Sequence, residues 1–323
     1  MAKQKPYAPK RHPMQKITKY ERKRELIALS FIAPNFIGFA VFTLLPVLFS
    51  IFLSFVKWKG GSFDTMEWVG LGNYAEIFKT AKVAEKGLGY LFTKVDLGIA
   101  LKNTVFYTLV TVPMTLVCAV ALALALNRAV KGAVGFRTIF FFPYVASMVA
   151  ICVCWRFMMM KDGPINQFIM ALGIPFNKSW TADSGMAIWS IILVSVWRNM
   201  GYYMVIYLAA LQGVPTDLYE AATMDGANKW QQFLHVTLPQ LRPTTFFAST
   251  MMIISCFKIY DVVAIMTEGG PGRSTKMLVT YIYDEAFSNF NYGIASAIAM
   301  VLLVIVLIFT LAQFSMEDRY ANN

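Results

Sequence analysis

Long apolar stretches alternate with shorter polar ones along most of the chain. A helix that crosses a bilayer needs about 20 predominantly apolar residues. Six stretches have that length, and they predict transmembrane helices at residues 26–56, 103–127, 137–160, 186–211, 244–266 and 293–316. Because proline cannot continue the helical hydrogen-bond ladder, Pro34 and Pro46 predict a kinked or interrupted first helix, and Pro143 predicts an early break in the third. The pattern indicates an all-α membrane protein.

The polar stretches between these helices predict loops rather than a separate soluble domain. Residues 57–102 have mixed charge and many glycines, which favours an external loop with short helices of its own. Residues 161–185 and 268–291 are rich in glycine, proline and polar residues and are also expected outside. We therefore expect one transmembrane domain over residues 26–316, with a tail at 1–25 and a short C-terminus at 317–323.

The insert at residues 212–243 is polar and helix-forming, although apolar helices flank it on both sides. Pro215 ends the helix before it, and Pro239 and Pro243 close it off. A second amphipathic piece at residues 229–238 follows the first short helix. The pattern predicts two short helices held against the membrane surface between prolines.

The first of these short helices carries signals at both ends. Asp217 stands three residues before Glu220, which is the spacing of a capping box at a helix N-terminus. Gly226 is placed where a left-handed turn would end the helix. Both signals predict a rigid element.

Two motifs resemble those of a known family. Glu220-Ala221-Ala222, then Asp225-Gly226-Ala227, then Leu238-Pro239 resemble the EAA signature of membrane subunits of bacterial ABC importers, and TEGGPG at Thr267–Gly272 resembles the sugar-permease branch, which includes maltose and multiple-sugar permeases. The resemblance covers roughly residues 27–314. It implies a MetI-like permease fold with six transmembrane helices, in which the insert is the coupling helix that docks in a cytoplasmic ATPase. The alternative is an ordinary amphipathic loop helix at a membrane surface.

Composition agrees with a membrane protein, since 57% of the residues are hydrophobic and only 15% are charged. The formal net charge is +11. Much of it comes from a basic N-terminal block, formed by Lys3, Lys5, Lys10, Arg11, Lys16, Lys19, Arg22, Lys23 and Arg24. Such a block before an apolar helix favours a cytoplasmic anchor on anionic lipid headgroups over nucleic-acid binding.

The positive-inside rule gives an orientation. The basic block places the N-terminus in the cytoplasm, and six helices return the C-terminus there. The basic turn at residues 128–137 agrees, whereas the lysine-rich loop at residues 57–102 does not. This orientation places the insert inside, and the resemblance implies a bacterial cytoplasmic, or inner, membrane.

No catalytic or metal-binding set is visible. The two histidines, His12 and His235, stand apart from any nucleophile, and the four cysteines lie in apolar segments. The stretch at residues 269–276 is glycine-rich but lacks the Gly-Lys-Ser/Thr order of a phosphate loop. We expect no enzyme and no cofactor in this chain, with ATP and Mg bound by a partner ATPase.

The insert supplies the coupling candidates. Glu220 is expected to pair with a basic residue of the ATPase, and Ala221 and Ala222 to allow close approach of the two backbones. Asp225 and Gly226 are expected to shape the turn between the short helices. A cap at the helix N-terminus remains an alternative role for Glu220.

Charged side chains within the predicted spans lead to the cargo candidates. A charge at membrane depth is costly, so its presence there is by default taken as functional. Sugars bind to aromatic faces and to groups that donate and accept hydrogen bonds, and the resemblance places the cargo cavity between the fourth and fifth helices. The candidates are Arg198, Asn199, Tyr202, Ser255 and Lys258. For Arg198 a salt bridge to another helix is an equal alternative. Lys258 and Asp261, three residues apart, are able to pair on one helix face.

Together these features predict the permease subunit of an ATP-driven carbohydrate importer. The expected partners are a second permease subunit, two cytoplasmic ATPase subunits, an external solute-binding protein and the lipid bilayer, with no nucleic acid. A related importer of a non-sugar solute such as glycerol phosphate is the alternative. A secondary carrier would need coupled carboxylates in its helices, and few are present.

Overall fold

The computed structural model describes residues 19–127, 132–176 and 178–321. Residues 1–18 and 128–131, which hold most of the basic N-terminal block and part of the basic turn, lie outside the described ranges. The described chain is almost wholly helical and contains one two-stranded antiparallel sheet, in which β1 (Val56–Lys57) pairs with β2 (Glu67–Trp68). It divides into two compact units, residues up to Phe52 and residues from Leu53 on.

The described part of the first unit is one long helical run. It consists of α1 (Lys19–Phe39), a π-helical turn (Ala40–Leu44) and α2 (Leu45–Leu53). The amide of Leu45 bonds to the carbonyl of Ala40, five residues back, and the next residue, Pro46, has no amide to donate. The run therefore continues past Pro34 and Pro46, with a local π-helical widening before Pro46. Of the two predicted outcomes, a kink or an interruption, the interruption does not occur.

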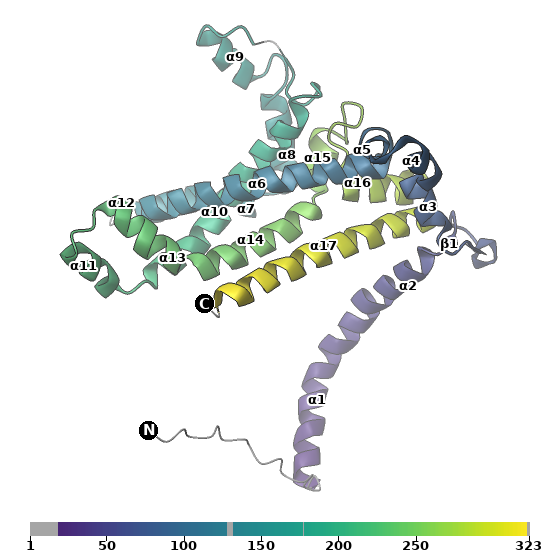
Figure 1. Ribbon diagram of the computed structural model, residues 1–323, viewed down its shortest axis with the longest axis horizontal. Helices are drawn as coiled ribbons and strands as arrows, with labels where there is room; N and C mark the ends of the chain where they lie inside the picture. The colour runs from purple at the N-terminus through teal and green to yellow at the C-terminus, as the bar shows by residue number, and fades with distance from the viewer. Residues whose placement is uncertain (1–18, 128–131, 177, 322–323) are drawn as a thin grey trace. The chain divides into compact units, whose positions relative to one another are not determined.

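The second unit is a bundle of helices that run alongside one another (Figure 1). Its long members are α6 (Asp96–Leu126), α10 (Ala187–Gln212) and α17 (Tyr292–Ala321). α10 packs on α6, and the shorter α14 (Arg242–Phe257) packs on α6 and α17. Fully buried side chains such as Ile191, Met204 and Tyr207 of α10 form the centre of this core.

Two predicted spans are broken helices. The third consists of α7 (Ala133–Val145) and α8 (Met148–Met158), which meet at 97°. The predicted early break in the third span is confirmed, but it lies at Ala146, whose backbone is extended, and Pro143 itself is accommodated inside α7. The fifth consists of α14 and α15 (Asp261–Met266), separated at residues 258–260. In the described ranges, four helices are long and apolar enough to span a bilayer, or five if the bent pair counts as one.

The segments between spans are folded. Residues 72–94 form α3 (Gly72–Phe78), α4 (Thr80–Lys86) and α5 (Leu88–Lys94), and α6 begins at Asp96, seven residues before the predicted start at 103. Later segments contain α9 (Pro164–Ala171), α16 (Leu278–Tyr283) and a π-helical turn (Asp284–Ser288). The insert contains α11 (Thr216–Met224), α12 (Lys229–Gln232), a π-helical turn (Phe233–Thr237) and α13 (Leu238–Gln240).

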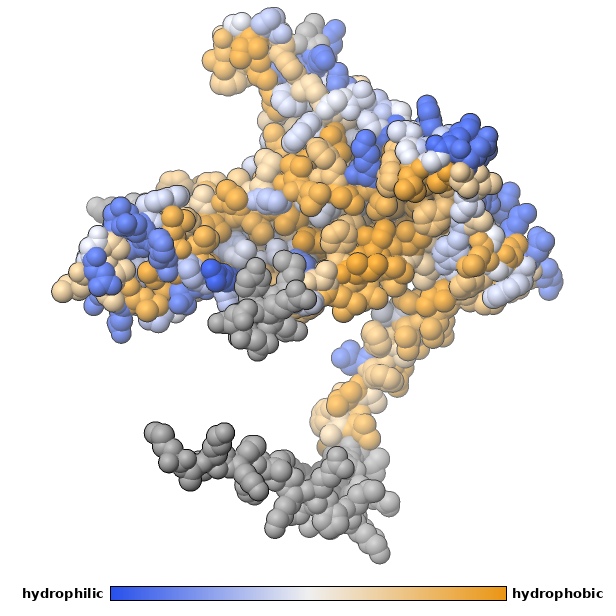
Figure 2. Space-filling view, in the orientation of Figure 1, coloured by the Kyte–Doolittle hydropathy of each residue, from blue (hydrophilic) through white to orange (hydrophobic). Residues whose placement is uncertain are grey.

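Polar surface gathers at the two ends of the second unit. Figure 2 shows an apolar middle between hydrophilic surface around α11 and α12 and hydrophilic surface around α3 to α5. An apolar band between polar ends is the surface that a bilayer requires. The insert and the segment at residues 72–94 therefore lie at opposite ends of the bundle.

A close helix contact at Gly201 gives a stability prediction. A Cβ atom at Gly201 would collide with the carbonyl of Phe140, so α10 and α7 approach through this glycine, whereas Gly135 of α7 has open space around it. We expect Gly201→Ala to cost about 1 to 3 kcal/mol through overpacking. Gly135→Ala, the control, should be neutral or stabilise by up to about 1 kcal/mol. Thermal unfolding of the purified protein measures both, and equal melting temperatures for the two variants would contradict the contact.

Candidate functional site

The insert is built as predicted at its C-terminal turn. Gly226 has φ +80°, a conformation that glycine adopts without strain. The amide of Ala227 donates to the carbonyl of Ala222 at 2.9 Å, and the amide of Gly226 donates to that of Thr223 at 3.0 Å. These two bonds form a Schellman motif. The left-handed turn predicted at Gly226 is confirmed.

The capping box predicted from Asp217 to Glu220 was wrong. α11 begins at Thr216 after Pro215, and no side chain caps it. Because the proline starts the helix one residue early, Asp217 already lies in the first turn, where its charge favours the positive end of the helix dipole. The capping box of this segment is at α12 instead, where Asn228 and Gln231 exchange side-chain bonds of 2.9 and 2.8 Å.

Polar side chains brace the insert from within. The hydroxyls of Tyr219 and Thr237 lie 3.0 Å apart, which ties α11 to the π-helical turn. The side-chain amide of Gln232 donates to Thr223 at 2.9 Å. Gln232 and Thr237 are buried. α11 and the segment after it are therefore held as one body.

The predicted coupling residues lie on the outside of this body. Glu220, Ala221, Asp225 and Gly226 are exposed and Ala222 is half-buried. Glu220 makes no cap bond and no ion pair among the residues described. Large apolar side chains of the insert are also exposed, with Met224 at 87% and Trp230 at 66%. A hollow of about 510 Å³ next to Trp230 is lined by α12 residues and by Leu124 and Leu211 of the bundle.

All five predicted cargo residues line one cavity of about 230 Å³ in the bundle. Arg198, Asn199 and Tyr202 come from α10, and Ser255 and Lys258 come from the end of α14 and the break after it. The cavity also has lining residues that the sequence analysis did not select: Tyr107, Tyr144, Met148, Ser195, Tyr203, Met252, Cys256, Ile259, Tyr260, Asp261 and Val262. Tyr144 and Met148 flank the bend between α7 and α8.

Arg198 is held by Tyr144. Its Nη2 donates to the Tyr144 carbonyl at 3.3 Å, and its guanidinium lies 5.2 Å from the centre of the Tyr144 ring. That ring stacks on Tyr202, with centroids 4.3 Å apart and planes at 17°. No carboxylate pairs with Arg198 in the described part of the chain. The alternative of a salt bridge to another helix is therefore not seen within this chain.

The remaining candidates keep hydrogen-bonding capacity for a ligand. Asn199 donates to the Ser195 carbonyl at 2.7 Å, which leaves its amide oxygen as an acceptor. Ser255 donates to the Met251 carbonyl at 2.9 Å. Lys258 and Asp261 do not pair within 4.0 Å, because residues 258–260 interrupt the helix on which they would share a face. Both side chains are exposed and open into the cavity.

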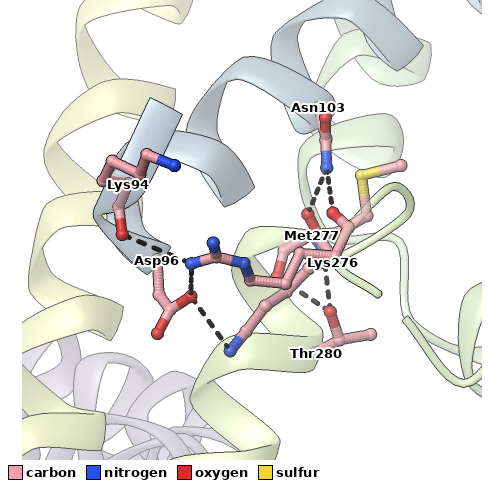
Figure 3. A network of polar contacts seen from close by, with 7 residues as sticks. Lys94, Asp96, Asn103, Lys276, Met277 and Thr280 are labelled. Carbon is pink, nitrogen blue, oxygen red and sulfur yellow. Dashed lines mark hydrogen bonds and ion pairs between the residues drawn. The ribbon is translucent and has the colours of Figure 1, made fainter. Parts of the chain in front are cut away.

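The TEGGPG loop is anchored to the start of α6. Arg273 Nη1 bonds to Asp96 at 2.9 Å, and Lys276 Nζ lies 3.9 Å from the same carboxylate oxygen. From α6, Asn103 donates to the carbonyls of Arg273 and Lys276, both at 3.0 Å (Figure 3). The Lys276 ammonium lies 4.4 Å from the centre of the Tyr281 ring, and burial raises the pKa of the Tyr281 hydroxyl, which stays neutral at physiological pH. These contacts make the loop a structural anchor.

This geometry defines a class of protein. A helical membrane bundle with a polar cavity at depth, broken helices beside it and a braced polar insert at one end is the architecture of a transport permease. The chain belongs to the family described as binding-protein-dependent transport system inner membrane component, whose model matches residues 119–322. It is therefore a permease subunit of an ABC importer with the MetI-like fold.

Individual proteins agree with this assignment. The chain is 38% identical to the probable ABC transporter permease protein YesP of Bacillus subtilis, over 93% of each chain. It is 34% identical to the lactose transport system permease protein LacF of Rhizobium radiobacter, over 86% of this chain and 90% of that one. A crystal structure of a bacterial ABC transporter that imports the acidic polysaccharide alginate has the same fold, with a TM-score of 0.77, 21% identity and coverage of 93% of this chain and 98% of that one.

The Gly226 turn gives a prediction for the insert. Replacing Gly226 with valine should strain the turn by about 1 to 2 kcal/mol, whereas asparagine, which tolerates left-handed backbone, should retain it. Amide hydrogen exchange on the purified protein measures the result. Gly226→Val should lose protection at the amides of residues 226 and 227, and Gly226→Asn should keep it. Equal protection in both variants would show that the turn does not depend on this backbone conformation.

Proposed function

We propose that this chain carries a carbohydrate across the bacterial inner membrane into the cytoplasm, driven by an ATPase that docks on α11. The observation that carries the proposal is the meeting of all five cargo candidates in one cavity. A stacked pair of tyrosine rings, an amide and hydroxyls supply the aromatic faces and the hydrogen-bonding groups that sugars require. The similarity to a lactose permease supports the same class of cargo.

The exposed face around Glu220 supports the docking role of α11. In this scheme the carboxylate of Glu220 pairs with a basic residue of the ATPase, and the exposed apolar side chains of Met224 and Trp230 enter its surface. Aromatic and methionine side chains are enriched in the cores of protein interfaces. Because α11 is braced through Tyr219 and Gln232, a displacement of the segment is passed on rather than absorbed.

The complete importer contains further chains. A second, related permease completes the cargo cavity, two cytoplasmic ATPase subunits bind ATP and Mg, and an external solute-binding protein delivers the cargo. Both termini of this chain and the insert face the cytoplasm. The chain performs no covalent chemistry, since ATP hydrolysis takes place in the partner subunits.

The transport cycle follows from two conformations of the assembly. ATP binds more tightly to the closed pair of ATPase subunits than to the open pair, and this difference in affinity is what shifts the equilibrium. Closure draws the two α11 segments together and opens the cavity to the outside, where the binding protein releases its cargo. Hydrolysis returns the cavity to the cytoplasmic side.

Removal of the Glu220 side chain tests the coupling. We expect Glu220→Ala in the assembled complex to reduce substrate-stimulated ATP hydrolysis and uptake by about tenfold or more, because a charge-assisted contact of about 1.5 to 3 kcal/mol is lost. Glu85→Ala, which removes an exposed acid of α4 at the other end of the bundle, is the control and should behave as wild type. Wild-type stimulation in Glu220→Ala would sink the coupling assignment.

Changes to the cavity wall test the cargo site. Tyr202→Ala removes a ring stacked on Tyr144, and Asn199→Ala removes an amide acceptor. We expect each variant to raise the KM for uptake several-fold. An aromatic contact contributes about 0.5 to 1.5 kcal/mol, and a neutral hydrogen bond contributes about 0.5 to 1.5 kcal/mol. Tyr202→Phe keeps the ring and should lie close to wild type in KM if stacking is the main interaction. Unchanged KM and cargo preference in both alanine variants would remove these residues from the site.

A further inference from the structure

The charges in the cavity do not cancel. Among the described lining residues Arg198 and Lys258 are cationic and Asp261 is the single carboxylate, which leaves one positive charge in excess. Neither cation lies within 4.0 Å of a carboxylate in the described residues. The cavity therefore has one net positive charge, and neither of its cations is in a direct ion pair with a described carboxylate.

Arg198 in particular has unused donors. Its only hydrogen bond in the described part of the chain is the 3.3 Å contact with the Tyr144 carbonyl, and its Nε is buried without a partner. A guanidinium offers five N–H donors in a planar fork that matches a carboxylate or phosphate. Because charge at membrane depth is costly and by default functional, an arginine that has unused donors there points to a ligand that accepts hydrogen bonds from them.

Asp261 does not serve as that anion. It is the first residue of α15, where its carboxylate stabilises the positive end of a new helix. Lys258 stands at the opposite side of the helix break, at the end of α14, and its exposed ammonium opens into the same cavity as Arg198. Both cations line the same cavity as Tyr202, so the acid group and the sugar ring of one ligand would meet cations and an aromatic ring in the same space.

We propose that the cargo is an anionic carbohydrate, a sugar or polyol that bears a carboxylate or phosphate bound by Arg198 and Lys258. The inference rests on the proposed function and specifies its substrate class. The guanidinium of Arg198 binds the acid group in bidentate fashion, Lys258 adds a second positive charge, and Tyr202 contacts the sugar ring. A neutral sugar would leave both cations unpaired.

Uptake by the assembled importer with its binding protein, reconstituted in vesicles, tests the proposal. The probes are a uronic-acid disaccharide, the methyl ester of the same disaccharide, and a sugar phosphate. The ester keeps the skeleton and removes the charge. We expect uptake of an anionic probe at about tenfold or more over the ester, which is the range of a charge-assisted hydrogen bond. The acid and phosphate arms show which group the site takes.

Variants then assign the preference to this chain. Arg198→Gln should lower uptake of the anionic probe by about tenfold or more relative to its effect on the ester, and Arg198→Lys should lie between it and wild type. Lys161→Gln, which removes an exposed lysine outside the cavity, is the control. Co-elution of the subunits establishes that each complex is assembled. If the Arg198→Gln complex fails to assemble, the comparison of acid and ester uptake by the wild-type complex decides whether the importer prefers an anionic cargo.

Two results would overturn the inference while leaving the carbohydrate assignment in place. One is uptake of the neutral ester equal to or better than that of the acid, with no uptake of the phosphate. The other is an assembled Arg198→Gln complex that keeps the preference for the anionic probe, because an acid of the partner permease then neutralises Arg198. Failure to take up any carbohydrate, charged or neutral, would instead overturn the proposed function together with the inference.

Discussion

The structure depends on one constraint, which is that no backbone amide or carbonyl can be left unpaired in hydrocarbon. A helix inside a membrane can therefore be interrupted only where something other than lipid satisfies the released groups. Both interrupted spans of this chain, α7–α8 and α14–α15, have residues beside their breaks in the same cavity. Near the end of α7, the Tyr144 carbonyl accepts a hydrogen bond from Arg198. The two helix breaks therefore form part of the cavity wall.

This feature explains why a cation is tolerated at depth. A helix C-terminus carries a partial negative charge from its unpaired carbonyls, and a cation beside it is stabilised. Arg198 sits at such an end and also faces the Tyr144 ring. The tyrosine therefore holds the guanidinium in place from two sides, and it also positions Tyr202 through ring stacking. Tyr144 acts on the cavity through the residues it orients.

Several residues of the cavity could be predicted from the sequence. The others could not, and the physical reason can be given in each case. Arg198, Asn199 and Tyr202 lie on one uninterrupted helix, so a charge at mid-span was enough to find them. Tyr144 was missed because its part in the cavity comes from the bend at Ala146. Pro143 predicted a break nearby, but neither the angle of 97° nor the side chains that the bend brings together. Whether Lys258 pairs with Asp261 could not be predicted for the same reason, since helical spacing has no meaning across a break.

In the insert, too, one feature could be predicted from the sequence and another could not. Gly226 was recognisable because a left-handed turn selects for one residue type, whatever surrounds it. The box from Asp217 to Glu220 was a spacing match that depended on the position of the first helical residue. A shift of one position, set by Pro215, removed it. A residue type that a particular backbone conformation requires therefore predicts local structure better than a residue spacing, which depends on where the helix begins.

The anchor at Asp96 has a mechanical consequence. α15 runs directly into the TEGGPG loop, and that loop is bound to the first turn of α6 by Arg273 and to its second turn by Asn103. A displacement of this loop therefore acts on two members of the bundle at once: on α6 through these hydrogen bonds, and on α15, which continues into the loop. Residues of the break before α15 line the cavity, so the loop, the start of α6 and the cavity wall form one connected structure.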